Sequence, residues 1–539
     1  MASPGSVADI GDLYFDVPVS AVPSLGRRYT YKLGAGIVGL AAALGTQTIV
    51  PRALGPESLG HYAFLTNFFG QLAGMLSIGV SLAFVTKLAA RPNEVKLVSF
   101  FRYVVIGIGA TILLFTAAAF AMRFDHQLWP GERGAYVWMA ALLGFGLWSL
   151  DSLGGVNDAL GFTVPAERTR IATKLTGLLV LAGMFLLGVL TLGSYFAWSI
   201  GSVVSLGAFW LRLLHRNPSL RRVPWVLARE DRQRYAREFI AYCGPLAAYA
   251  VANSIALLFD RWLLQRFAGA REQGFYGFSY QLGALIFLGT SAIVPLLTRE
   301  FSVAHGRSDV PRMAQLFKDT LPRLFFVAAF FGAFAAVNAR SFVSLFGGTA
   351  YAAAAAPVAI MAFYPMHQTY GQVSGGLFYA TGRTALYRNI GVTTLLIGIP
   401  ISFLLFASRD AGGMGLGATA LAGKMLVFQI VVVNVQLYFN AKMLKLSLAP
   451  FLVHQLLTVA VLVAVALGGA GLVWGASGSW RAMPQMSAPQ LIVAGFLYGV
   501  VVLGLVAVFP RLAGLRREEL RAIIARMERL LSARRRTAP

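Results

Sequence analysis

Hydrophobic positions in this chain gather into long runs, not into alternating or short patterns. A membrane-spanning helix needs about 20 mostly apolar residues, and runs of this length recur between charged residues and Gly or Pro breaks. They predict spans at about residues 31–50, 58–86, 98–122, 135–160, 168–191, 194–213, 239–262, 274–298, 320–344, 352–379, 385–407, 415–440, 451–475 and 489–509. The pattern therefore predicts an all-α integral membrane protein with about 14 transmembrane helices.

Composition and charge agree with a membrane protein. Only 13% of the 539 residues are charged, about half of the roughly 25% usual in a soluble domain. With the N-terminus placed in the cytoplasm, 36 of the 46 Lys and Arg residues fall on the cytoplasmic side and nine on the other, while Lys424 lies within a span. Because basic residues accumulate in cytoplasmic loops, both termini are expected inside. This distribution explains the net charge of +24 without a nucleic-acid partner.

A sequence repeat divides the chain. The pattern R-x-x-G-x4-G-x-Y-x-F occurs at residues 52–64 and again 214 positions later, at residues 266–278, each time after the first span of a six-span block. An even number of spans gives both copies the same orientation, so we expect two lobes related by an axis along the membrane normal, with the substrate route between them. The predicted segments are a tail (1–30), a first six-helix lobe (31–213), a basic linker (214–238), a second six-helix lobe (239–440), two C-terminal spans (441–510) and an end segment (511–539).

The end segment carries nine arginines set mostly between apolar residues at helical spacing. This pattern is typical of a basic amphipathic helix on an anionic cytoplasmic membrane surface. A solvated tail helix is the alternative.

Five segments of the chain form an ordered set that is more specific than any one of them. They are PRALGPESLGHYAF (51–64), LLFDRWLLQRFAGAREQGFYGFSYQLGALIFLGTSAIVPLLTREF (257–301), LFGGTAYAAAAAPVAIMAF (345–363), GGLFYATGRTALYRNIG (375–391) and AGGMGLGATALAGK (411–424). Together they resemble the bacterial polysaccharide repeat-unit flippases, which export O-antigen or exopolysaccharide units and belong to the multidrug, oligosaccharidyl-lipid and polysaccharide exporter superfamily. The resemblance extends over about residues 30–510.

The resemblance implies a V-shaped pair of six-helix lobes in the bacterial inner membrane. Such a protein would move an undecaprenyl-diphosphate-linked oligosaccharide to the outer leaflet by alternating access. The expected partners are the lipid-linked glycan and membrane lipids, with a polysaccharide polymerase as a further candidate. A cation-coupled drug exporter of the same superfamily is the alternative function.

Cations within or beside spans are candidates for binding the diphosphate, because guanidinium and ammonium groups meet phosphate oxygens with charged hydrogen bonds. Lys424 lies about ten residues into its span, and a charge at that depth is costly unless it is functional or paired. Its alternative is an ion pair with Asp151 or Asp158 of the fourth span. Arg52, Arg261 and Arg266 lie at outer span ends, where snorkelling to the interface is the alternative.

Acidic and amide side chains complete the predicted site. Asp151 and Asp260 are candidates for ion coupling, since a buried carboxylate takes up a proton more readily. Asp260 adjoins Arg261, but neighbours on a helix point about 100° apart and need not pair. Asn67 and Gln281 are candidates for binding sugar hydroxyls, with interhelical hydrogen bonding as the favoured role for any single amide.

Enzymatic, metal and cofactor chemistry find little support in the sequence. Cys243 is the only cysteine, and His and Cys residues do not cluster at ligand spacing. The longest expected outer segment, 476–488, contains no acid, which disfavours a glycan polymerase or glycosyltransferase that works through paired carboxylates. A transporter with no cofactor is therefore predicted.

Overall fold

The computed structural model describes residues 25–91, 94–215, 224–291, 293–476, 485–522 and 525, and within them the chain is helical with no strand. The expected N-terminal tail, the middle of the basic linker and most of the arginine-rich end segment lie outside the described residues. The first half of the chain contains α1 (Leu25–Ser77), α2 (Val80–Ala90), α3 (Val95–Ala121), α4 (Asp125–Leu128), α5 (Gly134–Ala159), α6 (Thr163–Leu186) and α7 (Leu192–Leu214).

The second half repeats this order. It contains α9 (Arg229–Ser291), α10 (Val294–Gly306), α11 (Val310–Val337), α12 (Ala339–Gly347), η3 (Thr349–Ala354), α13 (Ala355–Met361), α14 (Tyr364–Ala380), α15 (Thr384–Phe406), η4 (Arg409–Ala411) and α16 (Ala418–Met443). The chain then continues through α17 (Ala449–Ala476), α18 (Ala488–Val508) and η5 (Pro510–Ala513).

The predicted all-α membrane class is confirmed. Ten helical segments of the described residues are long and apolar enough to cross a membrane, and they coincide with ten of the expected spans. The other four expected spans fall on the long helices α1 and α9 and their continuations α2 and α10. The total of fourteen spans stays a prediction.

The sequence repeat corresponds to a repeated backbone. Both α1 and α9 are broken at the first glycine of the repeat, where Gly55 (φ 72°, ψ 172°) and Gly269 (φ 84°, ψ 176°) adopt the same left-handed φ. Such a φ is accessible to glycine at little cost. The second glycines, Gly60 and Gly274, pack reciprocally: a Cβ on Gly60 would lie 1.7 Å from the Ala270 carbonyl oxygen, and a Cβ on Gly274 would lie 1.8 Å from that of Pro56.

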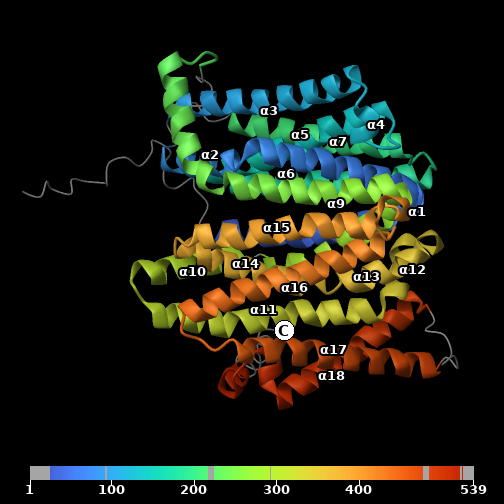
Figure 1. Ribbon diagram of the computed structural model, residues 1–539. Coiled ribbons are helices and arrows are strands. Elements are labelled where there is room, and N and C mark those ends of the chain that lie inside the picture. Colours follow the sequence, from blue (N-terminus) through green and yellow to red (C-terminus); the bar gives the residue numbers. More distant parts are fainter. Residues whose placement is uncertain are drawn as a thin grey trace, which may run out of the picture.

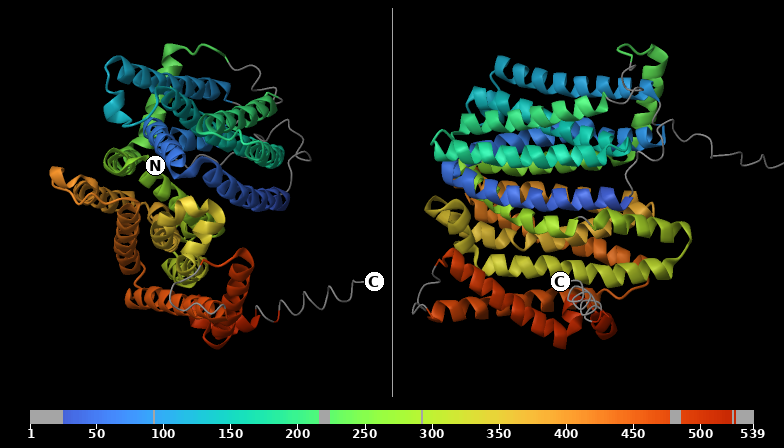
Figure 2. Two further views of the ribbon diagram at one scale, coloured as in Figure 1. Left: turned by 90° about the vertical axis from the view of Figure 1, so that its right-hand side faces the viewer. Right: turned by 180° about the vertical axis from the view of Figure 1, so that it is seen from behind.

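The helices run side by side as two groups (Figure 1). Helices of the first half occupy the upper part of that view and helices of the second half the lower part, with α9 between them; α1 packs most extensively against α9. The views from the side and from behind show α17 and α18 at the far edge of the second group (Figure 2), where α17 packs on α11. The contact between the two repeat copies therefore lies at the centre of the molecule.

Candidate functional site

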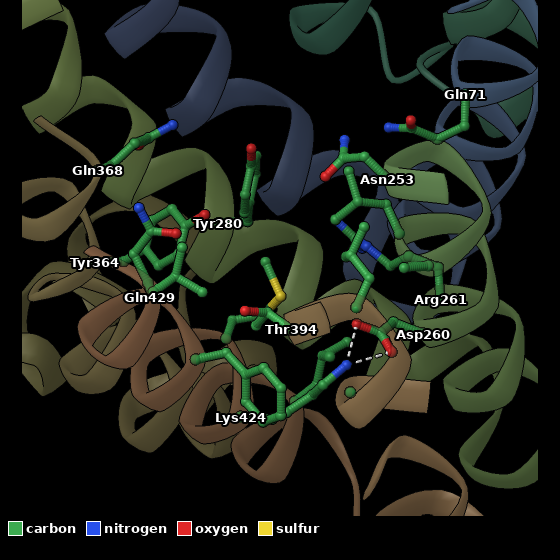
Figure 3. Close-up of a pocket in the computed structure, with 18 of the residues that line it drawn as sticks. Gln71, Asn253, Asp260, Arg261, Tyr280, Tyr364, Gln368, Thr394, Lys424 and Gln429 are labelled. Carbon is green, nitrogen blue, oxygen red and sulfur yellow. Dashed lines mark hydrogen bonds and ion pairs between the residues drawn. The ribbon is translucent and has the colours of Figure 1, made fainter. Parts of the chain in front are cut away.

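A cavity of about 390 Å³ lies where α1 of the first half meets α9, α14, α15 and α16 of the second (Figure 3). We call it the second-half cavity. Its lining is unusually polar for a space between apolar helices, and three of the lining residues are charged: Asp260, Arg261 and Lys424. An intramembrane ionisable group is a functional candidate because its burial is costly.

The central feature of this cavity is an ion pair between α9 and α16. The Lys424 ammonium lies 2.6 Å from both carboxylate oxygens of Asp260, and each side chain is only 7% exposed. Ser402 of α15 completes the group: its hydroxyl donates to Asp260 Oδ1 over 2.5 Å and accepts a hydrogen bond from Lys424 over 2.6 Å. Three helices are thus joined through one carboxylate.

The expected alternative for Lys424, a pair with Asp151 or Asp158, is wrong. Both aspartates are exposed on α5 in the first half of the molecule, whereas the partner of Lys424 comes from α9, beside it in the second half. The lysine packs beside Gly398 of α15, where a Cβ would lie in ordinary contact with the ammonium at 3.6 Å.

Arg261 faces the same cavity but uses different partners. Its guanidinium lies 4.2 Å from the ring centroid of Tyr276, a cation–π distance, and donates to the side-chain oxygen of Gln273 over 3.1 Å. The Gln273 amide in turn donates to the Arg261 carbonyl oxygen over 2.8 Å. Asp260 and Arg261 are therefore held apart, as their helical geometry suggested. One anion and two cations give this cavity a net positive charge.

The amide candidates divide between two cavities. Asn67 lines the second-half cavity, and its side-chain oxygen is buried with no hydrogen-bond partner among the described residues. Gln281 lines a different cavity, of about 510 Å³, formed by the beginning of α1 with α6, α7 and the later part of α9. We call this space the first-half cavity.

The remaining three candidates lie outside the second-half cavity. Arg52 donates to the Leu345 carbonyl oxygen over 2.7 Å and so connects α1 to α12. Arg266 is exposed, one turn beyond Arg261, and Asp151 is exposed on α5. Neither arginine is among the residues that line the second-half cavity with Arg261.

Sequence reasoning missed Ser402, Gln273 and the cation–π role of Tyr276. Only Tyr276 carried a signal, since it is the tyrosine of the repeat. A site for a metal is not apparent, because the described residues hold no group of three or more His, Cys, Asp or Glu side chains placed to bind one.

Comparisons with known proteins place this geometry in context. Residues 25–299, just over half of the chain, match the family model of polysaccharide biosynthesis proteins. No curated protein sequence matches the chain.

Three of the solved structures that share the fold illustrate the similarity. The lipid II flippase MurJ in an inward closed conformation has a TM-score of 0.61 at 12% identity, covering 90% of this chain and 99% of that chain. An inward-facing multidrug resistance MATE family transporter of the MOP superfamily has a TM-score of 0.57 at 13% identity, covering 78% and 97%. Its outward-facing counterpart has a TM-score of 0.53 at 17% identity, covering 78% and 95%.

Proposed function

The chain belongs to the polysaccharide biosynthesis protein family, and from that premise we propose that it moves undecaprenyl-diphosphate-linked oligosaccharide repeat units across the bacterial inner membrane by alternating access. It is a multi-pass membrane transporter with the fold of the MOP superfamily. The observation that carries the proposal is the second-half cavity, in which two cations and one anion meet between the two repeat copies.

A net positive cavity suits an anionic lipid headgroup. Arg261 presents a planar guanidinium that can meet two phosphate oxygens at once, and its present hydrogen bond is to the neutral amide of Gln273. Its charge is thus available to a ligand. Lys424 of α16 provides a second cation, at present neutralised by Asp260 (Figure 3).

The same pair supplies a means of coupling. An entering diphosphate and the Asp260 carboxylate compete for the Lys424 ammonium, so occupation by substrate favours the capture of another cation by Asp260. We therefore assign ion coupling to Asp260. Asp151, the other candidate, is exposed on α5 and faces no such competition.

We also propose that both termini are cytoplasmic, on the strength of the 36 to nine distribution of basic residues. In this orientation the lobes at residues 31–213 and 239–440 rock about the Gly60–Gly274 contact. The flipped glycan would then become available to a polymerase on the outer face.

A cation-coupled drug exporter is the other function that the fold accommodates. The two MATE structures cover 78% of the chain, against 90% for the lipid II flippase. A positively charged cavity also disfavours the cationic ligands of such an exporter. Both observations support the lipid-linked glycan as substrate.

A binding experiment tests the proposal. Purified protein in nanodiscs is titrated with undecaprenyl diphosphate bearing an oligosaccharide, and separately with the lipophilic cation tetraphenylphosphonium. Because one charged hydrogen bond contributes about 1.5–3 kcal/mol, we expect Arg261→Gln to weaken binding of the lipid at least about tenfold. The matched control, Arg266→Gln on the same helix, should leave it unchanged. Wild-type protein that binds the cation and not the lipid would overturn the proposal in favour of the exporter.

A further inference from the structure

The first-half cavity is the repeat counterpart of the second-half cavity. Their lining residues on α1 and α9 correspond at the 214-residue offset of the repeat, including Gln47 with Arg261, Tyr62 with Tyr276 and Asn67 with Gln281. The other walls correspond as well. In the first-half cavity α6 contributes residues 173, 174 and 177, and in the second-half cavity α15 contributes the residues 221 positions later, 394, 395 and 398. Likewise, five lining residues of α7 are followed 226 positions later by five lining residues of α16. The two spaces are therefore the same architectural site built twice.

Aromatic rings form one wall of the first-half cavity. Tyr195 and Trp198 of α7 stack with centroids 5.5 Å apart and planes 13° apart, and Tyr62 packs on Tyr195 at 4.6 Å. The indole N–H of Trp198 donates to the Gly177 carbonyl oxygen over 3.1 Å, which fixes the ring. A fixed aromatic face can pack against the C–H face of a sugar ring.

Unsatisfied polar groups face the same space. Gln47 lines the cavity and is only 6% exposed, yet its amide nitrogen has no hydrogen-bond partner among the described residues. A buried donor without a partner is costly, so this amide is suited to a ligand that supplies an acceptor. Sugar hydroxyls accept and donate, which matches the hydroxyl and amide groups of the lining.

Lys174 of α6 gives this cavity its charge. Its ammonium reaches across to α1, where a Cβ on Gly39 would lie 2.7 Å from it. None of the residues that the structure places around the cavity is acidic. Unlike Lys424, this lysine therefore has no carboxylate beside it in the cavity lining. An anionic group on a ligand could form an ion pair with its ammonium.

We propose that the first-half cavity binds an acidic sugar of the transported glycan, such as a uronic acid, while the second-half cavity holds the diphosphate. The proposal rests on the proposed function and assigns the two ends of one substrate to the two repeat copies. Trp198 provides the stacking face, Gln47 the donor to a hydroxyl, and Lys174 the partner of the sugar carboxylate.

The test separates the sugar from the diphosphate by using three ligands. Wild-type protein in nanodiscs is titrated with undecaprenyl diphosphate alone, with the same lipid bearing an oligosaccharide that contains glucuronic acid, and with its neutral glucose analogue. We expect Gln47→Leu to weaken binding of both glycan-bearing lipids roughly three- to tenfold, the range of one hydrogen bond, and to leave the bare lipid unchanged. Because the Gln47 amide nitrogen has no hydrogen-bond partner among the described residues, this variant gives up no bond from that nitrogen and should fold about as well as wild type.

Two further variants sharpen the assignment. Lys174→Met should weaken only the acidic glycan, and Trp198→Phe should retain more glycan affinity than Trp198→Ala. The control is Phe209→Ala, at an exposed position on α7, the helix that carries Trp198. It should change none of the three affinities. Equal effects of Gln47→Leu on all three ligands, or none on any, would overturn the proposal. Failure of the bare lipid diphosphate to bind wild-type protein would instead count against the proposed function.

Discussion

The two cavities occupy equivalent places in the repeat and hold opposite chemistry at the same position. Lys424 of the second-half cavity corresponds to Trp198 of the first, and each side chain lies against an equivalent glycine, Gly398 or Gly177. Asp260, the partner of the lysine, corresponds to Thr46. A buried ion pair in one copy is thus an aromatic and a hydroxyl in the other.

This difference distinguishes the backbone features that both copies share, which we call the frame, from the side chains that give each cavity its chemistry. The frame is kept in the backbone: the broken helices at Gly55 and Gly269 and the mutual packing of Gly60 and Gly274 are the same in both copies. Several side chains that line the cavities have diverged, as Lys424 from Trp198 and Asp260 from Thr46, although Tyr62 and Tyr276 are alike. We conclude that the fold tolerates different chemistry at the cavity positions as long as the glycine contact at the centre is preserved.

The largest effect should come from breaking the ion pair that the first-half cavity lacks. Asp260→Ala leaves the Lys424 ammonium buried without its partner, which typically costs about 3–5 kcal/mol, so we expect a sharp fall in thermal stability and membrane abundance. Adding Lys424→Met should restore most of both, since no buried charge remains. Asp151→Asn, at an exposed position, is the control and should stay within about 0.5 kcal/mol of wild type. If the double variant is no more stable than Asp260→Ala, the unpaired Lys424 charge is not the cause of the destabilisation.

Substituting either glycine of the Gly60–Gly274 contact should lower the stability of the protein by a similar amount. A methyl group at Gly60 or at Gly274 would overlap a backbone carbonyl oxygen of the other copy, and relieving such overlap by a backbone shift costs about 1–3 kcal/mol. We therefore expect Gly60→Ala and Gly274→Ala to lower the unfolding temperature by similar amounts. Gly70→Ala, where a Cβ meets nothing within 4 Å, should be neutral or slightly stabilising because alanine favours the helix. A loss confined to one of the two variants would contradict a symmetric contact.

Much of this frame could be predicted from the sequence. Apolar runs of about 20 residues identified the ten helices within the described residues that could span a membrane, because bilayer thickness sets their length. The first glycine of the repeated pattern falls between expected spans, where α1 and α9 are in fact continuous helices broken at Gly55 and Gly269. Asn67 and Gln281 were both named from the sequence, but only the two cavities show that these amides occupy equivalent places in the two copies.

Pairing within the site could not be predicted in the same way. Asp260 and Lys424 are 164 residues apart in the chain, and only the packing of α9, α15 and α16 brings them together. Arg52 and Arg266 fit the cationic pattern as well as Arg261 does, yet of these three arginines Arg261 alone lines the second-half cavity. A charge within a predicted span identifies a candidate, whereas its partner depends on which helices become neighbours.

The smallest expected effect concerns ion pairs that join helices at the ends of the two halves that we expect in the cytoplasm. Lys87 of α2, in the first half, donates to Glu238 at the beginning of α9 over 2.6 Å. In the second half, Arg323 of α11 donates to Glu519, beyond η5, over 2.7 and 2.8 Å. The Arg516 backbone N–H, with Arg323 in support, holds the pKa of Glu519 below its ordinary value of 4.5. A carboxylate with a lowered pKa stabilises the folded form above its ordinary pKa and loses that contribution as the pH falls through the lowered one.

We therefore expect this attachment to be constant at neutral pH and to loosen only below about pH 4.5. The pair is about one-third exposed, so solvent screening limits its contribution to roughly 0.5 kcal/mol. Hydrogen exchange of residues 514–519, followed between pH 7 and pH 3 after correction for intrinsic rates, measures it. Glu519→Gln should exchange faster at pH 7 and lose the added acceleration at low pH, because no carboxylate remains to be protonated. If wild type and Glu519→Gln keep the same pH profile, the ion pair does not fasten this segment, and the packing of η5 against α11 alone must hold it.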